Sequence, residues 1–170
     1  MIVVADSGPL HYLILLEHIE LLRRFYGQVL VPEPVAGELS AAAAPAVVRD
    51  WMRKPPTWVD VRPVPSDAVA MITDDLDPGE RAAIALAETV HADLLLIDEA
   101  AGRAEAKRRH LRVTGTLGVL RARRAKPGKR ARAARTTQGD QLLSGRDAFE
   151  RGLRPVAEAL ARRSFSPQRT

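Results

Sequence analysis

The chain has 170 residues, a net charge of +5 and no cysteine. This length suits one domain of ordinary size, and a hydrophobic content of 46% excludes a largely disordered chain. The lack of cysteine excludes disulfides and thiolate metal sites and fits a cytoplasmic protein. No apolar run approaches the roughly 20 residues that span a bilayer. The start has no basic leader, so we expect neither a membrane span nor a signal peptide.

The charge is unevenly distributed along the chain. Residues 1–100 carry 7 Lys and Arg against 16 Asp and Glu, whereas residues 101–170 carry 19 against 5. Acidic side chains can hold cations and basic side chains can hold phosphates, although two solvated surfaces of different charge would give the same counts. The charge pattern alone leaves both interpretations open.

Short apolar runs alternate with amphipathic segments and predict strands and helices in turn. Residues 2–5 form the first predicted strand, and the helical segment 10–25 follows with a bend near His18. Further strands are predicted at 28–31, 58–61, 94–97 and 112–114, and further helices at 35–44, 46–53, 67–76, 78–91, 100–109 and 115–123. This alternation predicts an α/β fold on a mainly parallel sheet of four to five strands.

The regular pattern ends at Arg124. Residues 125–148 predict a basic, flexible loop, and residues 149–170 predict a C-terminal amphipathic helix and a tail. Eight Lys and Arg lie between positions 121 and 135, and they begin with Arg121, Arg123, Arg124 and Lys126. They could attract an RNA backbone or form a solvated loop. An aromatic content of only 4% argues against extensive base stacking.

Two aspartates follow apolar strands at the point where each strand ends. Asp6 follows the first strand and Asp98 follows the strand at 94–97. Parallel α/β sheets place their sites beyond these strand ends, and neighbouring strands lie about 4.8 Å apart. Glu80 opens one helix and Glu38 lies in another, so both could reach the same edge. Gathered carboxylates repel one another unless a cation neutralises them, and oxygen ligands suit Mg²⁺ or Mn²⁺.

Each of these acids also has a structural alternative. Asp6 and Ser7 could cap the first helix, and Asp98 could cap the helix that follows it. Asp77 and Glu80 have the spacing of a capping box around Pro78. Glu38, in turn, could be an ordinary solvated helix residue. No single acid therefore decides the function.

Other motifs point less clearly to chemistry. The four histidines lack metal-ligand spacing, and Ser7 lacks the flanking glycines of a hydrolase elbow. Ser7 could instead cap a helix or bind a metal-bound water. Residues 115–118 do not form a phosphate loop, so Thr114 or Thr116 is better interpreted as a helix cap. Arg103 lies about one helical turn after Asp98 and could contact a substrate or pair with an acid.

Five blocks at residues 4–10, 31–38, 76–87, 95–106 and 114–120 carry a resemblance. The first spells Val-Ala-Asp-Ser-Gly-Pro-Leu, the third opens with Leu-Asp-Pro-Gly-Glu, and the fourth opens with Leu-Leu-Ile-Asp-Glu. In this order the chain resembles the PIN-domain superfamily, and within it the VapC-like toxin ribonucleases that begin with Asp-Ser-Gly-Pro-Leu. The resemblance covers residues 1–124, which would form a PIN-like nuclease domain.

The resemblance implies a three-layer α/β/α fold and hydrolysis of single-stranded RNA. It implies that Mg²⁺ or Mn²⁺ is bound by an acidic quartet, which would be Asp6, Glu38, Glu80 and Asp98. Such toxins pair with a small antitoxin protein and form homodimers. The basic stretch at residues 126–144 is longer than the family pattern. Residues in candidate supporting roles are Ser7, Glu99, Arg103 and Thr114.

The sequence thus predicts a divalent-metal-dependent endoribonuclease that uses a metal-activated water and acts as the toxin of a type II toxin–antitoxin pair. The alternative is a non-catalytic PIN-like module that binds RNA or a protein and keeps the acids as caps. A phosphoacceptor signalling domain would need a lysine after a late strand, and none follows residues 112–114.

Overall fold

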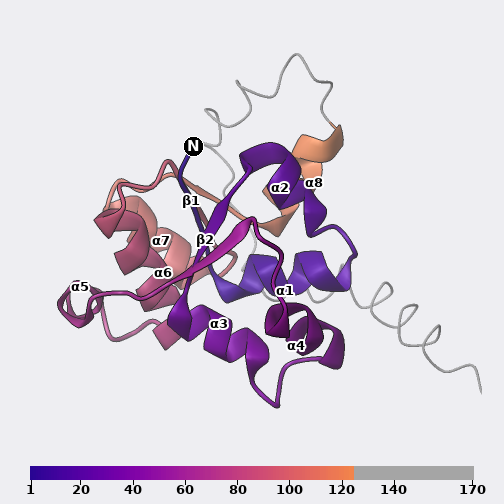
Figure 1. Ribbon diagram of the computed structural model, residues 1–170. Helices are drawn as coiled ribbons and strands as arrows, with labels where there is room; N and C mark the ends of the chain where they lie inside the picture. Colours follow the sequence, from indigo (N-terminus) through magenta and orange to yellow (C-terminus); the bar gives the residue numbers. More distant parts are fainter. Residues whose placement is uncertain (125–170) are drawn as a thin grey trace, which may run out of the picture. The chain divides into compact units, whose positions relative to one another are not determined.

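A computed structural model describes residues 1–124 of the chain (Figure 1). Five parallel strands form one sheet in the order β3-β2-β1-β4-β5, so the prediction of a mainly parallel sheet of four to five strands is confirmed. The strands are β1 (Val3–Ala5), β2 (Val29–Pro32), β3 (Val59–Arg62), β4 (Leu94–Leu96) and β5 (Val113–Thr114). The predictions for residues 125–148 and 149–170, and for Lys126, lie outside the described residues.

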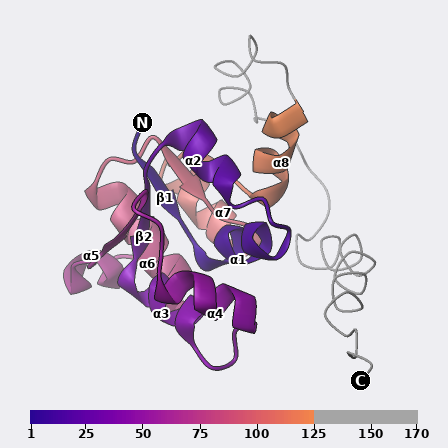
Figure 2. The ribbon, with the colours of Figure 1, turned by 45° about the vertical axis from the view of Figure 1, so that its right-hand side comes forward.

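Helices cover both faces of the sheet and give the three layers (Figures 1 and 2). One apolar core joins the sheet to α1 (Ser7–Leu15), α2 (Glu20–Tyr26), α3 (Glu33–Ser40), α4 (Ala46–Arg53) and α8 (Thr116–Arg124). A second core joins the opposite face to α5 (Ser66–Ala70), α6 (Pro78–Thr89) and α7 (Ala100–Arg108). The structure is therefore an α/β/α sandwich.

The two cores follow from the alternation of side chains along each strand. In β1, Val3 and Ala5 face the first core, whereas Val4 faces the second. In β4, Leu94 and Leu96 face the first core, and Leu95 faces the second. Both strands are buried on both faces, as continuous apolar runs predict for the centre of a parallel sheet.

The strand register brings the ends of β1 and β4 to one edge of the sheet. Ala5 pairs with Leu96, and the N–H of Asp6 donates to the carbonyl of Leu96 at 2.9 Å. The residues that follow β1 and β4 therefore lie next to each other, at the C-terminal ends of the two strands. This edge carries the candidate site.

Two predicted helices have different bounds in the structure. The helix predicted at 35–44 is α3, which begins at Glu33 because a proline is tolerated in a first helical turn. It ends at Ser40 instead of the predicted Ala44, because the backbone of Ala41 is extended, with φ −64° and ψ 153°.

The helix predicted at 67–76 is also shorter, because α5 ends at Ala70. After it, the N–H of Asp75 donates to the hydroxyl of Thr73 at 3.4 Å. Such local side-chain hydrogen bonds compete with a helix. The predicted bend near His18 is confirmed, since α1 and α2 are separate helices. Within residues 1–124, no helix has the length and apolar character to cross a membrane.

Candidate metal centre

Asp6 lies at the end of β1 and is only 2% exposed. Asp6 occupies the N-cap position of α1, but its side chain makes no capping hydrogen bond to the backbone of α1. One of its oxygens, Oδ1, has no hydrogen-bond partner among residues 1–124. Burial raises the pKa of Asp6 from 3.8 to about 8, with additional repulsion from nearby acids and an opposing effect of the Ser7 backbone N–H. Simple helix capping therefore does not account for this carboxylate.

Asp98 follows β4 after one intervening residue and is partly buried. Its Oδ1 accepts the backbone N–H of Thr116 at 2.8 Å, and its Oδ2 accepts the Thr116 hydroxyl at 2.6 Å. Burial raises the pKa of Asp98, whereas these hydrogen bonds and the charge of Arg103 lower it. Asp98 therefore holds the first residue of α8. It does not occupy the cap of α7, where the N-cap residue is Glu99.

Gly8 marks how close the two aspartates lie. A Cβ added to Gly8 would lie 3.6 Å from Oδ2 of Asp98 and 3.8 Å from Oδ2 of Asp6. Both carboxylates thus face one small volume above the first turn of α1. The sequence-based expectation that these two acids meet at adjacent strand ends agrees with this geometry.

Glu80 lies in the first turn of α6 and is 5% exposed. The predicted capping box is present, since the Glu80 N–H donates to Asp77 Oδ1 at 2.8 Å and the Asp77 N–H donates to Glu80 Oε2 at 3.3 Å. Its other oxygen, Oε1, finds no partner within the described residues. Burial first, and then the charge of Asp77, raises the pKa of Glu80 to about 7, although the backbone N–H groups of Asp77 and Gly102 lower it. Glu80 therefore caps its helix with one oxygen and leaves the other buried and unpaired.

Glu38 reaches the same region from α3. Its side chain is exposed, and its Oε2 lies 2.8 Å from the position that a Cβ would take on Gly79. The Oδ1 of Asp77 lies 3.3 Å from that same position. Glu38 and Asp77 therefore approach the start of α6 together, and the charges of both raise the pKa of Asp6.

The donor chemistry of this cluster fits a hard divalent cation. All of its groups are carboxylates, which suit Mg²⁺ or Mn²⁺. The unpaired oxygens of Asp6 and Glu80 are buried where a positive charge would relieve both their desolvation and their repulsion. Within residues 1–124, no three acidic side chains already surround one point as a finished coordination sphere. Binding would thus require the side chains to move together around the cation.

Two residues of this region were not among the predicted site residues. Thr116, predicted only as a helix cap, is fully buried and donates to Asp98 across 18 positions of sequence. Asp77 was predicted only as a cap, but its charge also raises the pKa values of Asp6 and Glu80. A threonine two residues after a strand end, at the start of a helix, was the available signal for the first contact. The acid-rich segment before α6 was the signal for the second.

The predicted supporting residues have unequal positions. Ser7 begins α1 beside Asp6, and the charge of Glu99 raises the pKa of Glu80. Thr114 lies at the end of β5, but the hydroxyl that donates to Asp98 belongs to Thr116, two residues later.

The predicted RNA-binding arginines lie along α8, away from its first residue. The Nη1 of Arg123 approaches Nε2 of His18 at 2.8 Å, and Arg121 is exposed. Arg124 ends α8, and its side chain is outside the described residues.

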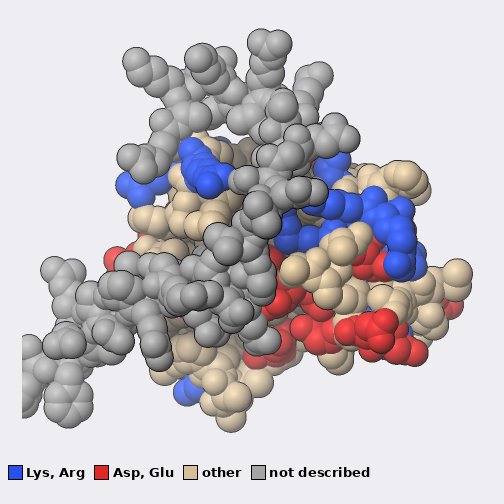
Figure 3. All heavy atoms as spheres, turned by 180° about the vertical axis from the view of Figure 1, so that it is seen from behind, with Lys and Arg blue, Asp and Glu red and all other residues tan. Residues whose placement is uncertain are grey.

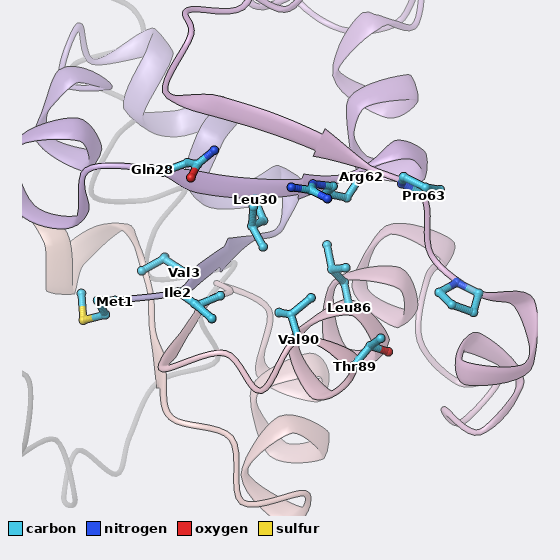
Figure 4. Close-up of a pocket in the computed structure, with 11 residues that line it drawn as sticks. Met1, Ile2, Val3, Gln28, Leu30, Arg62, Pro63, Leu86, Thr89 and Val90 are labelled. Atoms are coloured by element: carbon cyan, nitrogen blue, oxygen red, sulfur yellow. The ribbon is translucent and has the colours of Figure 1, made fainter.

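The structure also holds a pocket of about 450 Å³. Figure 4 shows the side chains that line it. It is lined by Leu86, Thr89 and Val90 near the C-terminal end of α6, whereas Glu80 lies in the first turn of that helix. The start of β1 and Leu30 of β2 supply more apolar lining. None of the predicted site residues lines this pocket, so its position separates it from the carboxylate cluster.

The protein is thus an α/β/α sandwich whose acidic side chains lie at the C-terminal ends of its parallel strands. The family model DUF3368, described as a PIN domain, matches residues 2–135. The chain therefore belongs to this PIN-domain family, whose members are generally nucleases. No match was found among curated proteins.

Proposed function

We propose that this protein is a divalent-metal-dependent endoribonuclease. The main support is the approach of Asp6 and Asp98 at one edge of the sheet, with the charges of Glu80 and Glu38 near enough to raise the pKa of Asp6. One buried oxygen each of Asp6 and Glu80 also lacks a hydrogen-bond partner among residues 1–124. Buried unpaired carboxylate oxygens are costly, and a fold retains them most readily where a ligand satisfies them. Membership of a PIN-domain family supports the same activity.

The acidic side chains would have different roles in metal binding. Asp6 and Asp98 would hold Mg²⁺ or Mn²⁺, and Glu80 and Glu38 would complete the cluster directly or through water. Thr116 keeps the Asp98 carboxylate in place with two hydrogen bonds. A bound divalent cation would lower the pKa of a coordinated water molecule and stabilise the negative charge that develops on a phosphodiester.

The reaction needs no covalent intermediate with the protein. Water adds its oxygen to the phosphorus, one phosphorus–oxygen ester bond breaks, and the departing oxygen takes a proton. Glu80 would be partly protonated near neutral pH in the metal-free protein, because its pKa is about 7. Its buried position lets it hold a proton close to the reacting groups.

The finer biological role is also part of the proposal. The protein would act in the cytoplasm on RNA, as the toxin of a type II pair, as a homodimer and under control of a cognate antitoxin protein. The resemblance to VapC-like toxins and the excess of basic residues after position 100 support this role. A small neighbouring gene whose product suppresses growth arrest by this protein is the expected finding. Growth unaffected by expression of the active protein would contradict the toxin role.

One observation favours a non-catalytic PIN-like binding module as the second candidate. Asp77 and Glu80 do form a capping box, and Asp98 does hold the start of α8, so these acids have structural duties. This alternative predicts that Asp98→Asn leaves RNA or protein binding intact and that Mn²⁺ finds no site.

Cleavage of a labelled single-stranded RNA separates the two candidates. We expect cleavage with Mn²⁺ or Mg²⁺, none in EDTA, and at least a hundredfold loss in Asp6→Asn and Asp98→Asn. Asp50→Asn is the matched control, because Asp50 is exposed on α4 and forms an ion pair there with Arg53. Cleavage that persists in EDTA or in Asp6→Asn would exclude the metal-dependent mechanism.

A further inference from the structure

Arg103 places a positive charge beside the acidic cluster. A Cβ added to Gly115 would lie 3.2 Å from Nη1 of Arg103 and would also press against Oδ1 of Asp98. The guanidinium and the carboxylate thus share the space that a glycine leaves open. The charge of Arg103 is close enough to act on Asp98 electrostatically.

The side chain of Arg103 is anchored through a neutral group. Its Nη1 donates to the carbonyl of Ile97 at 3.0 Å. None of the ion pairs formed within residues 1–124 involves Arg103, although other arginines on α7 or just after it are paired with glutamates. A guanidinium has five N–H donors in a planar fork, so anchoring through one leaves others for a ligand.

We propose that Arg103 binds a phosphate of single-stranded RNA and positions the adjoining phosphodiester beside Asp98. Arginine suits this task because its fork matches two phosphate oxygens. An anchored guanidinium also loses little side-chain freedom on binding. This inference rests on the proposed function, and it names the residue that would hold the substrate.

Small and basic exposed side chains lie near Arg103 along α7. Ala100 and Ala104 are small and exposed on α7, and Lys107 is exposed one helical turn further on. Residues four apart on a helix lie about 5–6 Å from each other. Figure 3 shows Lys and Arg side chains gathered beside a band of Asp and Glu side chains. The RNA backbone would run from the acids along α7, past Arg103 and Lys107.

RNA binding measured in EDTA tests Arg103 separately from catalysis. A fluorescent single-stranded RNA is titrated with the full-length protein at several KCl concentrations, and log Kd is plotted against log [KCl]. Arg103→Gln should weaken binding about tenfold at low salt. It should also reduce the slope by about 0.7, the value for one phosphate contact on a single strand.

Arg103→Lys keeps the positive charge but loses the planar pair of N–H donors that the guanidinium offers. The slope of log Kd against log [KCl] should therefore stay at the wild-type value, while the affinity for RNA falls several-fold. Arg53→Gln is the control, since the side chain of Arg53 is 76% exposed on α4 and forms an exposed ion pair with Asp50. The basic residues after position 124 are present in every variant, so their effect cancels.

Wild-type affinity and slope in Arg103→Gln would overturn the proposal, as would a wild-type protein that binds no RNA. If Arg103→Gln does not fold, full wild-type affinity in Arg103→Lys would overturn it. A reduced slope in Arg103→Gln without RNA cleavage by the wild type would support Arg103 and contradict the nuclease.

Discussion

Replacing Asp6 with asparagine should stabilise the metal-free protein, and the gain should grow as the pH rises. Burial raises the pKa of Asp6 from 3.8 to about 8, so the native carboxyl holds a proton that the unfolded chain has released. Between these values the native state binds more protons, and the free energy of unfolding therefore falls as the pH rises. Asparagine does not titrate, so the variant avoids this loss.

The size of the effect follows from the raised pKa. Each pH unit between the two pKa values changes the free energy of unfolding by about 1.4 kcal/mol. From about pH 5 to about pH 7, the advantage of Asp6→Asn over the wild type should widen by about 2.7 kcal/mol. It should level off above about pH 8, where the native carboxyl also ionises. Glu80 and Asp98 titrate in both proteins, so their contributions largely cancel.

Urea denaturation followed by circular dichroism, in EDTA and at a series of pH values, measures this difference. An advantage of Asp6→Asn that does not change with pH would refute the reasoning about burial. Saturating Mn²⁺ should then narrow the advantage of the variant. The wild type gains about 2.7 kcal/mol at a Mn²⁺ concentration a hundredfold above Kd, and the variant gains far less.

Three further predictions concern the surroundings of the cluster. Thr116→Val removes the hydroxyl that donates to Asp98 and should cost about 1.5–3 kcal/mol in urea denaturation, whereas Thr116→Ser keeps that hydroxyl and should retain most of the stability. Gly102→Ala puts a methyl 2.5 Å from the Glu80 carboxylate and should lower stability by about 1–3 kcal/mol. The matched control Gly37→Ala, with nothing within 4 Å, should raise stability by about 0.5–1 kcal/mol. Mn²⁺ binding near neutral pH should release about one proton, seen as a buffer-dependent heat in calorimetry, and heats equal in all buffers would contradict this.

The sequence predicts the centre of the fold well because that part depends on local pattern. Continuous apolar runs at β1 and β4 predict strands buried on both faces, and the structure places these strands side by side. The positions of Asp6 and Asp98 follow directly, since each comes after such a strand. The capping box of Asp77 and Glu80 is also local and could be predicted from its spacing.

The contacts made over long sequence distances could not be predicted in this way. Asp98 could cap the helix after it or a helix from elsewhere, and only the packed structure shows that its partner is Thr116. The ends of α3 and α5 also depend on local backbone effects, such as the extended conformation of Ala41 after α3 and the Thr73–Asp75 hydrogen bond in the turn after α5. Composition and periodicity do not weigh such effects against each other.

Glu38 shows most clearly what sequence pattern alone does not predict. Nothing in its helix distinguishes it from a solvated glutamate, and its side chain is indeed exposed. Its place beside the start of α6 comes from the packing of α3 against that helix. A role for Glu38 therefore rested on the family resemblance, and its approach to Gly79 is the first geometric support for that role.

Anomalous diffraction from crystals of the wild-type protein soaked in Mn²⁺ tests the central proposal most directly. The account predicts a peak bounded by the carboxylates of Asp6, Asp98 and Glu80, at distances typical of oxygen ligands. The same soak of Asp6→Asn should lose the peak. A wild-type crystal with no peak at this edge of the sheet, at a Mn²⁺ concentration that supports RNA cleavage, would contradict the account.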